Sequence, residues 1–311
     1  MLESIAKETL FLHNAEMGLG AWAWGDRIFW NYGRGYTDDD IAAAFQTSLA
    51  GGVNLVDTAE VYGSGRSETL LGQFLKTTSQ PVLVATKFMP FPWRLGKRTF
   101  RNALQRSLER LGVSKVDLYQ VHFPFPPFPV ETWAEALAEA VKAGWTRSVG
   151  VSNYDKNQMQ RTYTVLSKYD IPLASNQVEY HLLDRKVEKN GLLDRCKEMG
   201  IRLIAYSPLA KGLLTGKYTS ENPPPGARGR NSGGILKELQ PFIALMTEIG
   251  SGHGEKTSGQ VALNWVICKG ALPIPGAKTA RQAGENVGAL GWRLTEAEIK
   301  ALDEASDKFT K

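Results

Sequence analysis

The chain has 311 residues, 42% of them hydrophobic and 22% charged, and these fractions are typical of a globular protein. No apolar run approaches the roughly 18 residues of a membrane-spanning helix. The net charge of +5 is spread along the chain without a basic cluster, so we expect neither a membrane nor a nucleic acid as a partner. The four histidines lack the spacing of metal ligands, so we expect no metal.

The N-terminal segment and the cysteines bear on the compartment in which the protein works. The first residues lack the apolar stretch of a secretory signal and the Arg- and Ser-rich character of a transit peptide. Only Cys196 and Cys268 are present, far apart and in segments of helical pattern, which argues against disulfides. We therefore expect a cytoplasmic protein, although a mature chain that had lost a targeting segment would have the same features.

Short β-branched or apolar runs alternate with longer helical patterns along the chain, as in repeated βα units around a parallel sheet. The runs predict eight strands, at residues 17–22, 54–58, 82–86, 116–121, 148–151, 174–178, 202–205 and 271–274. Eight such units favour a single domain, residues 1–311, folded as a (β/α)8 TIM barrel with a parallel eight-stranded sheet. The pattern alone leaves an open, doubly wound sheet as the alternative.

The segments between the predicted strands have the periodicity of amphipathic helices. Residues 101–111 and 131–143 repeat apolar side chains at three- and four-residue spacing, with polar residues between them. Gly112, Gly144 and Gly200 follow helical segments, at the position where a left-handed residue commonly ends a helix.

Two segments interrupt this alternation, residues 123–129 and residues 220–234. Both are too rich in proline or glycine for a helix or an interior strand, so we predict loops. Each follows the carboxyl end of a predicted strand, and parallel barrels carry their active sites at that end. An ordinary solvated loop is the alternative for both.

Four polar residues lie at or just beyond the ends of three consecutive predicted strands: Asp57, Tyr62, Lys87 and His122. A buried Lys87 needs an anionic partner, which Asp57 could supply from the neighbouring strand. Taken singly, each residue has a structural explanation, such as an aspartate that caps a turn or a histidine in the core. Their joint occurrence at adjacent strand ends favours an active site.

The four side chains suit the reduction of a carbonyl group. A phenol titrates near ~10 in water, and a neighbouring ammonium favours loss of its proton, so Lys87 would tune Tyr62 as a proton donor. Negative charge develops on the carbonyl oxygen as hydride attacks the carbon. An N–H of His122 and the hydroxyl of Tyr62 would stabilise that charge.

The chain resembles the aldo-keto reductases along nearly its full length. The similar segments are MGLGAW (17–22), NLVDTAEVYGSGRSETLLG (54–72), ATK (85–87), VDLYQVH (116–122), VGVSN (149–153), NQVEY (176–180), AYSPLAKGLLTGKY (205–218) and PIPGAKTARQAGENVGAL (273–290). The resemblance implies that Tyr62 is the general acid, that Lys87 and Asp57 tune it, and that His122 orients the carbonyl. It also implies a nicotinamide dinucleotide bound across the carboxyl end of the barrel. The chain has no suitably placed G-x-G-x-x-G motif of a Rossmann fold.

The resemblance further assigns binding of the cofactor, NADPH/NADP+, to matching positions. Ser152, Asn153 and Gln177 match residues that bind the carboxamide, and Tyr206 matches the ring that stacks on the nicotinamide. The segment from Ser207 resembles the loop that holds the pyrophosphate. The implied cofactor-binding residues are Trp22, Ser152, Asn153, Gln177, Tyr206, Ser207, Pro208, Leu209, Gly212, Lys217, Arg228, Gly276, Lys278, Gln282, Glu285 and Asn286.

The residues near Lys278 carry the predicted preference for NADPH over NADH. Lys278 opens a predicted helix, where its ammonium and the helix N-terminus could together hold a 2′-phosphate. Gln282, Glu285 and Asn286 follow on one face of that helix. Many members of the family that the chain resembles have arginine where this chain has Gln282, and the neighbouring Arg281 is the candidate substitute.

Aromatic residues after three of the predicted strands indicate the substrate class. Trp24 follows the first strand, Phe88 and Trp93 follow the third, and Phe123 and Phe125 follow the fourth. An aromatic cup at the mouth suits a hydrophobic or planar aldehyde, so we expect a small-molecule carbonyl substrate. Packing within the loops is the alternative for each residue.

The sequence thus predicts NADPH-dependent reduction of aldehydes or ketones to alcohols. The alternative is an NADPH-binding regulatory or scaffold protein with little turnover, because residues 275–286 also resemble the potassium-channel β subunits. Those subunits have asparagine at the position that His122 matches, which favours an enzyme here. A barrel lyase or isomerase with Lys87 as a Schiff base is a third possibility, but it gives the residues assigned to the cofactor no role.

Overall fold

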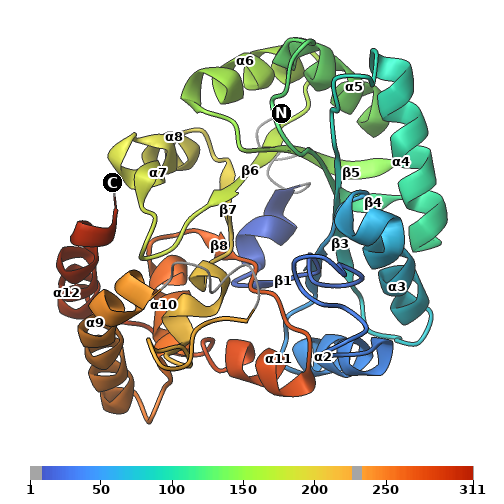
Figure 1. Ribbon diagram of the computed structural model, residues 1–311. Helices are drawn as coiled ribbons and strands as arrows, with labels where there is room; N and C mark the ends of the chain where they lie inside the picture. The colour runs from blue at the N-terminus through green and yellow to red at the C-terminus, as the bar shows by residue number, and fades with distance from the viewer. Residues whose placement is uncertain (1–8, 226–232, 311) are drawn as a thin grey trace.

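The computed structural model describes residues 9–225 and 233–310, and eight parallel strands form one sheet in chain order (Figure 1). The strands are β1 (Gly18–Gly20), β2 (Leu55–Asp57), β3 (Leu83–Phe88), β4 (Val116–Val121), β5 (Thr146–Ser152), β6 (Leu173–Glu179), β7 (Arg202–Tyr206) and β8 (Leu272–Pro273). Every one of them overlaps a predicted strand, so the predicted eight-stranded (β/α)8 barrel is confirmed and the open sheet is excluded.

The barrel closes between its first and last strands through a backbone contact just beyond β8. The amide of Gly20 donates a hydrogen bond to the carbonyl oxygen of Pro275 at 3.0 Å, and Gly20 also forms a parallel bridge with Gly276. A Cβ atom at Gly20 would lie 2.7 Å from the carbonyl oxygen of Ile274. Only glycine therefore lets the two backbones approach closely enough to close the barrel.

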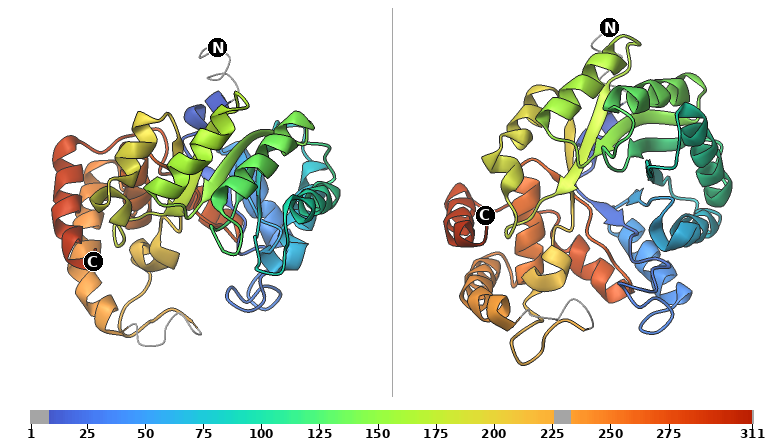
Figure 2. Two further views of the ribbon diagram at one scale, coloured as in Figure 1. Left: turned by 90° about the horizontal axis from the view of Figure 1, so that it is seen from above. Right: turned by 45° about the horizontal axis from the view of Figure 1, so that its top comes forward.

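Helices surround the strands, as the two views of Figure 2 show. They are α2 (Asp38–Ala50), α3 (Arg66–Leu75), α4 (Lys97–Leu111), α5 (Val130–Lys142), α6 (Lys156–Ser167), α7 (Lys186–Lys189), α8 (Leu192–Glu198), α9 (Gly233–Gly252), α10 (Ser258–Cys268), α11 (Ala280–Val287) and α12 (Glu296–Ser306), with the 3-10 helices η1 (Tyr62–Gly65), η2 (Ala210–Thr215) and η4 (Asp307–Phe309). Within residues 9–225 and 233–310, no helix is both long enough and apolar enough to cross a bilayer.

The predicted helix ends and loops agree with the structure except at one boundary. Gly112, Gly144 and Gly200 have φ angles of 67°, 74° and 65°, so each adopts the expected left-handed conformation. Residues 123–129 contain neither helix nor strand. Of the second predicted loop, residues 220–225 contain neither helix nor strand, and residues 226–232 lie outside the described residues. Its last two residues, Gly233 and Gly234, belong to α9, so that end of the prediction is wrong. The buried apolar side chains of α9 begin at Leu236, so the two glycines belong to an exposed first turn.

One end of the barrel is closed by apolar side chains. Leu55, Ala85, Leu118 and other inward-facing strand residues form a cluster with Phe11 and Leu12. Residues 9–14 are helical and precede β1, so this plug lies at the amino ends of the strands. The opposite end, where the strands run out, is thereby left for a polar site.

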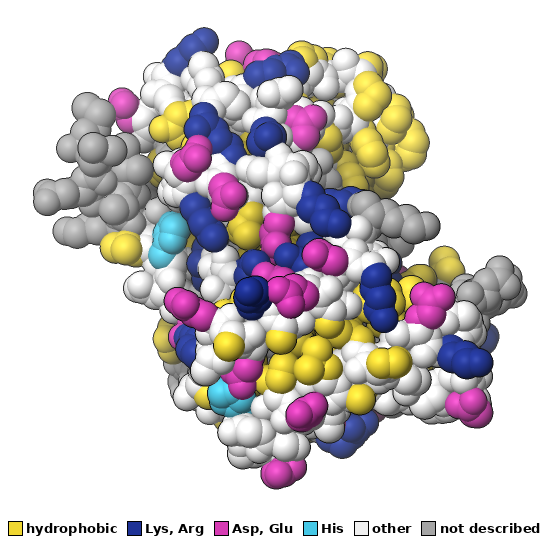
Figure 3. Space-filling view, turned by 90° about the vertical axis from the view of Figure 1, so that its left-hand side faces the viewer, with side chains coloured by type: hydrophobic (Ala, Val, Ile, Leu, Met, Phe, Trp, Pro, Cys, Tyr) yellow, Lys and Arg dark blue, Asp and Glu magenta, His cyan; other side chains and the backbone are white. Residues whose placement is uncertain are grey.

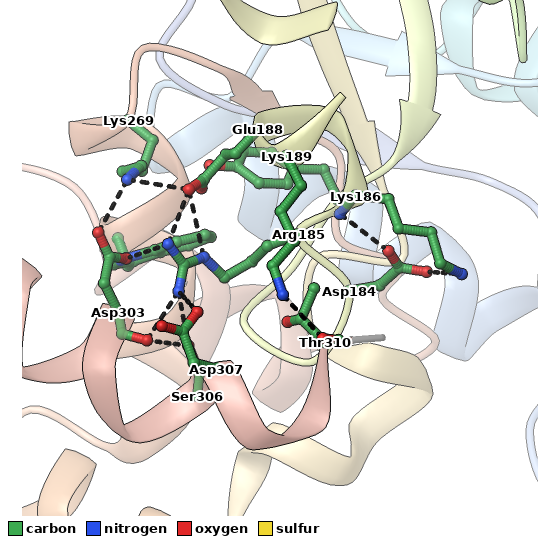
Figure 4. Close-up of polar contacts among 12 residues, drawn as sticks. Asp184, Arg185, Lys186, Glu188, Lys189, Lys269, Asp303, Ser306, Asp307 and Thr310 are labelled. Atoms are coloured by element: carbon green, nitrogen blue, oxygen red, sulfur yellow. Dashed lines mark hydrogen bonds and ion pairs between the residues drawn. The ribbon is translucent and has the colours of Figure 1, made fainter. Parts of the chain in front are cut away.

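The C-terminal helices are fastened to the barrel by an ionic cluster around Arg185 (Figure 4). Its guanidinium donates to the carbonyl oxygen of Asp303 at 2.7 Å and to carboxylate oxygens of Glu188 at 2.8 Å and Asp307 at 3.1 Å. Lys269, which follows the last residue of α10, joins the cluster through Glu188 and Asp303. Figure 3 shows the side of the molecule on which α12 and the C-terminus lie, with acidic and basic side chains interspersed over it.

Candidate active site

A cavity of about 650 Å³ opens at the carboxyl ends of the strands. Three residues of the predicted tetrad, Asp57, Tyr62 and His122, line it. The predicted cofactor residues that line it are Trp22, Ser152, Asn153, Gln177, Tyr206, Ser207, Pro208, Leu209, Gly212, Lys217, Gly276, Lys278, Gln282, Glu285 and Asn286. Arg228 lies outside the described residues.

Lys87 connects the polar residues from beneath the cavity. Its side chain is fully buried, and its Nζ donates to Asp57 Oδ1 at 2.5 Å, to the carbonyl oxygen of Thr58 at 2.9 Å and to Tyr62 Oη at 3.3 Å. The His122 and Tyr62 rings pack edge to face with centroids 5.8 Å apart. The four side chains predicted from the sequence are therefore gathered in one place.

Strand register accounts for this convergence. Asp57 on β2 pairs with Ala85 on β3, and Lys87 on β3 pairs with Gln120 on β4, so the polar side chains project from adjacent strand ends. Tyr62 is returned over the barrel by the turn that follows β2. In that turn Gly63 has φ 55°, and a Cβ atom there would lie 2.8 Å from the backbone of Gly25, so glycine is required beside Tyr62.

Burial and charge act in opposite directions on Tyr62 and Lys87. Burial raises the pKa of Tyr62, and the Lys87 ammonium offsets only part of that shift, so the net pKa lies above its ordinary value. Burial alone would lower the pKa of Lys87, but the Asp57 carboxylate and Tyr62 raise it above its ordinary value. The site therefore holds a protonated phenol beside an ammonium. Lys87 therefore lowers the pKa of Tyr62 in the direction expected from the sequence, but burial raises it by more.

His122 is a neutral imidazole in this environment. Burial, together with the Lys87 ammonium, holds the pKa of His122 well below its ordinary value of 6.5. Its Nδ1 is buried and has no hydrogen-bond partner among the described residues. One face of the ring stacks on Phe123, with centroids 5.2 Å apart. The stacking holds the imidazole ring beside Tyr62, and His122 lines the cavity.

The residues assigned to the nicotinamide end are hydrogen-bonded to the tetrad and to one another. Gln177 Nε2 donates to Asp57 Oδ2 at 2.8 Å, and Ser152 Oγ donates to the carbonyl oxygen of Gln177 at 2.8 Å. Asn153 Nδ2 donates to the carbonyl oxygen of His122 at 3.1 Å, and Asn153 Oδ1 accepts from Tyr206 Oη at 3.0 Å. These hydrogen bonds hold the Asn153 and Gln177 amides and the Tyr206 ring at the cavity wall. The amides could there bind the carboxamide of a nicotinamide, and the Tyr206 ring could stack on its ring.

The segment after β7 has an unusual backbone. Ser207, Ala210, Lys211 and Gly212 have φ angles of 53°, 49°, 56° and 96°. The amides of Ala210 and Gly212 donate to the carbonyl oxygens of Ser207 and Leu209, so backbone hydrogen bonds within the turn hold this conformation. With Lys217 on the same cavity wall, the segment fits a pyrophosphate.

The far end of the cavity is formed by α11 and the residues before it. Thr279, not Lys278, caps this helix, so the predicted helix start is one residue early. Gln282 Oε1 accepts a hydrogen bond from the Lys278 amide at 2.9 Å, and Arg281 forms an exposed ion pair with Glu285 at 2.6 Å. The Lys278 ammonium lies 5.3 Å from the centroid of Trp30, and both residues line the cavity.

The predicted aromatic cup is only partly correct. Trp24 is fully buried and its Nε1 donates to the carbonyl oxygen of Ala277 at 3.0 Å. Phe88 packs in the core against Phe100, and Trp93 is 72% exposed and outside the cavity lining. Only Phe123 of the five lines the cavity.

Phe125, the remaining aromatic of the predicted cup, lies next to the cavity wall. It stacks on Phe123 with centroids 4.8 Å apart. Trp22, assigned to the cofactor, and two residues that sequence reasoning missed, Trp30 and Met89, complete the apolar wall. The sequence did contain a signal against Phe88 as a cavity residue. Successive side chains of a strand point to opposite faces, so Phe88 must point out of the barrel if Lys87 points into it.

The chain thus combines a parallel (β/α)8 barrel with a cluster of Tyr, Lys, Asp and His at a cavity of about 650 Å³ at its carboxyl end. The model of the Aldo/keto reductase family matches residues 16–307. The chain belongs to the aldo/keto reductase family, and the resemblance noted in the sequence is confirmed. Family membership makes the protein an oxidoreductase of the carbonyl-reducing class.

Curated relatives cover nearly the whole chain. A chloroplastic pyridoxal reductase of Arabidopsis thaliana is 41% identical over 308 residues, which span 95% of this chain and 84% of the relative. An NADH-specific methylglyoxal reductase of Escherichia coli is 31% identical, with 96% of each chain covered. Both are reductases of small carbonyl compounds by name.

Solved structures agree with the fold and with the predicted cofactor. A glycerol dehydrogenase of Gluconobacter oxydans superimposes with a TM-score of 0.82 at 28% identity, covering 94% of this chain and 92% of its own. An aldo-keto reductase of Klebsiella pneumoniae in complex with NADPH has a TM-score of 0.75 at 28% identity. The match covers 93% of this chain and 90% of the Klebsiella chain. The latter protein binds NADPH on the fold that this chain adopts.

Proposed function

We propose that this protein reduces aldehydes or ketones to alcohols with NADPH, and that Tyr62 donates the proton. The observation that carries the proposal is the contact of Lys87 with both Asp57 and Tyr62 at the floor of a cavity lined by His122. When bound, the dinucleotide supplies the hydride that attacks the carbonyl carbon. The protein must then stabilise and protonate the oxygen.

Each member of the tetrad has a defined task in this proposal. Tyr62 keeps its proton at neutral pH because its pKa is raised, and it releases the proton to the oxygen as negative charge develops there. Lys87, charged through its contact with Asp57, stabilises the phenolate that remains. The neutral His122 contacts the carbonyl oxygen and orients it.

The cofactor residues support NADPH as the dinucleotide. Ser152, Asn153 and Gln177 would hold the carboxamide, and Tyr206 would stack on the ring. The turn at residues 207–212 would receive the pyrophosphate, and Lys278 would pair with the 2′-phosphate. Support comes from the continuity of these residues along one cavity.

We infer that the substrate is a ring aldehyde, with pyridoxal as the first compound to test. The cavity wall next to Tyr62 and His122 contains Trp22, Trp30 and Phe123, and flat aromatic walls favour planar ligands. The plant relative, named a pyridoxal reductase, supports the same substrate class.

Replacing Tyr62 with phenylalanine tests the proposed chemistry. The variant keeps the ring and its packing but lacks the proton, so we expect kcat for pyridoxal to fall by about 10²-fold or more, with the dissociation constant of NADPH unchanged. The loss of NADPH absorbance on addition of the aldehyde measures turnover. Undiminished turnover in the variant would contradict the proton-donor role, and absence of turnover in the wild type would favour the scaffold alternative.

A further inference from the structure

A second buried ion pair lies close to the tetrad, between Glu60 and Arg94. Their side chains are 5% and 19% exposed. Both guanidinium nitrogens of Arg94 engage the carboxylate, Nη2 donating to Oε2 at 3.1 Å and Nη1 donating to Oε1. Glu60 lies between Asp57 and Tyr62 in the sequence, whereas Arg94 belongs to the loop that connects β3 to α4.

This pair binds both backbone polar groups of a cavity residue. The amide of Met89 donates to Glu60 Oε1 at 2.8 Å, and the carbonyl oxygen of Met89 accepts from Arg94 Nη1 at 3.1 Å. Met89 lines the cavity together with Tyr62 and His122. The ion pair therefore sets the position of a wall residue without lining the cavity itself.

The loop between β3 and α4 is also folded around the guanidinium of Arg94. Its Cζ atom lies 5.2 Å from the centroid of Phe88 and 5.4 Å from that of Phe91. Phe91 in turn stacks on Trp93, with centroids 4.7 Å apart and planes 7° apart. A planar fork that binds a carboxylate at two points and packs between rings is a property of arginine that lysine lacks.

We propose that the Glu60–Arg94 pair determines substrate specificity by holding Met89 as the wall of the substrate cavity. The inference deepens the proposed reduction of ring aldehydes and rests on it. A ring aldehyde extends far enough from its carbonyl group to contact the wall, whereas a short-chain aldehyde needs only the tetrad. Loss of the pair releases Met89 and weakens binding of the larger substrate alone.

The test compares two aldehydes in wild type, Arg94→Met and Arg94→Lys. For pyridine-4-carbaldehyde we expect KM to rise about tenfold in both variants, because neither replacement can bind the carboxylate at two points. For propanal, kcat and KM should stay within about twofold of wild type. Equal losses for the two aldehydes, or no loss for either, would overturn the proposal.

Arg161→Met is the matched control. Arg161 also binds a carboxylate at two points, through Nε at 2.6 Å and Nη2 at 2.7 Å to Glu131, but its side chain is 51% exposed and outside the cavity lining. We expect it to change neither KM. An equal selective effect in this control would assign the result to a general loss of ion pairing and would contradict the proposal.

Binding without turnover separates this inference from the proposed function. Titration calorimetry of pyridine-4-carbaldehyde into protein saturated with NADP+ should give a dissociation constant about tenfold weaker in Arg94→Met. Met89→Ala, which removes the wall and keeps the ion pair, should give a similar weakening if the arginine variants fail to fold. If the wild type binds the aldehyde but never reduces it with NADPH, the proposed function fails alone. Unchanged binding in Met89→Ala or in folded Arg94→Met rejects the inference alone.

Discussion

The environment of Tyr62 sets when its proton can leave. Burial raises the pKa of the phenol and the Lys87 ammonium lowers it, with a net upward shift. The phenol is consequently protonated before the reaction. The Lys87 ammonium stabilises the negative charge that forms on the phenol oxygen once the proton has left. The residues at this site follow from the sequence, but the sign of the shift does not, because it depends on how much water is excluded.

The pH dependence of the reaction follows from His122 and Tyr62. The pKa of His122 lies well below 6.5, so the imidazole is neutral at and above that pH and becomes protonated only in more acidic solution. The pKa of Tyr62 lies above 10, so the phenol retains its proton. We expect kcat/KM to be level from pH 6.5 to about pH 9 and to decline only at lower pH.

His122→Asn provides the control for this profile. Asparagine can still donate to a carbonyl oxygen but does not titrate, so the acid decline should disappear while a lower rate remains. A midpoint of the wild-type profile near 6.5 would show that His122 is not shielded from water as the structure indicates.

Lys278 should separate the two dinucleotides. Lys278→Ala removes the cation assigned to the 2′-phosphate, and we expect the dissociation constant of NADPH to rise about tenfold or more, since a charge-assisted hydrogen bond contributes about 1.5–3 kcal/mol. That of NADH, which has no such phosphate, should not change. Fluorescence titration measures both constants, with exposed Lys300 replaced by alanine as control. Equal affinity of the wild type for both dinucleotides would refute the predicted preference, and the NADH-specific bacterial relative makes this comparison informative.

At the scale of elements, the seam between β1 and β8 has no room for a side chain at Gly20. Gly20→Ala would place a Cβ atom 2.7 Å from the carbonyl oxygen of Ile274, and both backbones belong to the closing contact. We expect the free energy of unfolding to fall by about 1–3 kcal/mol. Denaturant titration measures it.

Gly35→Ala is the control for the seam, because nothing lies within 4 Å of a Cβ atom at Gly35. We expect its unfolding free energy to stay within about 0.5 kcal/mol of wild type. A similar value for Gly20→Ala would mean that the barrel can open at this point without cost.

The strands and helix ends were predicted correctly where the signal lies within a short stretch of sequence. Each strand is a short apolar run, and glycines such as Gly112 end helices through their own backbone preference. The substrate residues were harder to predict. Trp24 and Phe88 are near the mouth in sequence but face the surrounding helices. Met89 lines the cavity, with its backbone bound by Arg94 of its own loop and by Glu60 from the segment after β2.

At the scale of the whole molecule, Arg185 joins the C-terminal helices to the body of the barrel. Arg185→Met would leave Asp307 without a cation and Glu188 and Asp303 with Lys269 alone. We expect the unfolding free energy at neutral pH to fall by about 3 kcal/mol. The cluster is outside the cavity lining, so kcat should not change below the unfolding range. Arg161→Met, at an exposed ion pair, should lower the unfolding free energy much less than Arg185→Met does.

The sign of the pH dependence provides a second check on the Arg185 cluster. Although burial opposes it, Arg185 and Tyr180 hold the pKa of Glu188 below its ordinary value of 4.5. The stability that this carboxylate contributes is therefore complete above 4.5 and is lost as the pH falls through the lowered pKa. The stability difference between wild type and Arg185→Met should shrink in acid. A difference that grows in acid would contradict the assigned ion pairs.

The sequence by itself determined the barrel, the family and the four polar residues, because strand runs, helix periodicity and the spacing of Asp57, Tyr62, Lys87 and His122 are properties of short stretches of chain. Only the tertiary structure decided which aromatic rings line the cavity, that burial outweighs Lys87 at Tyr62, and that Glu60 and Arg94 hold Met89. These features depend on excluded water and on contacts between residues that are distant in the chain, and neither is encoded in any one segment.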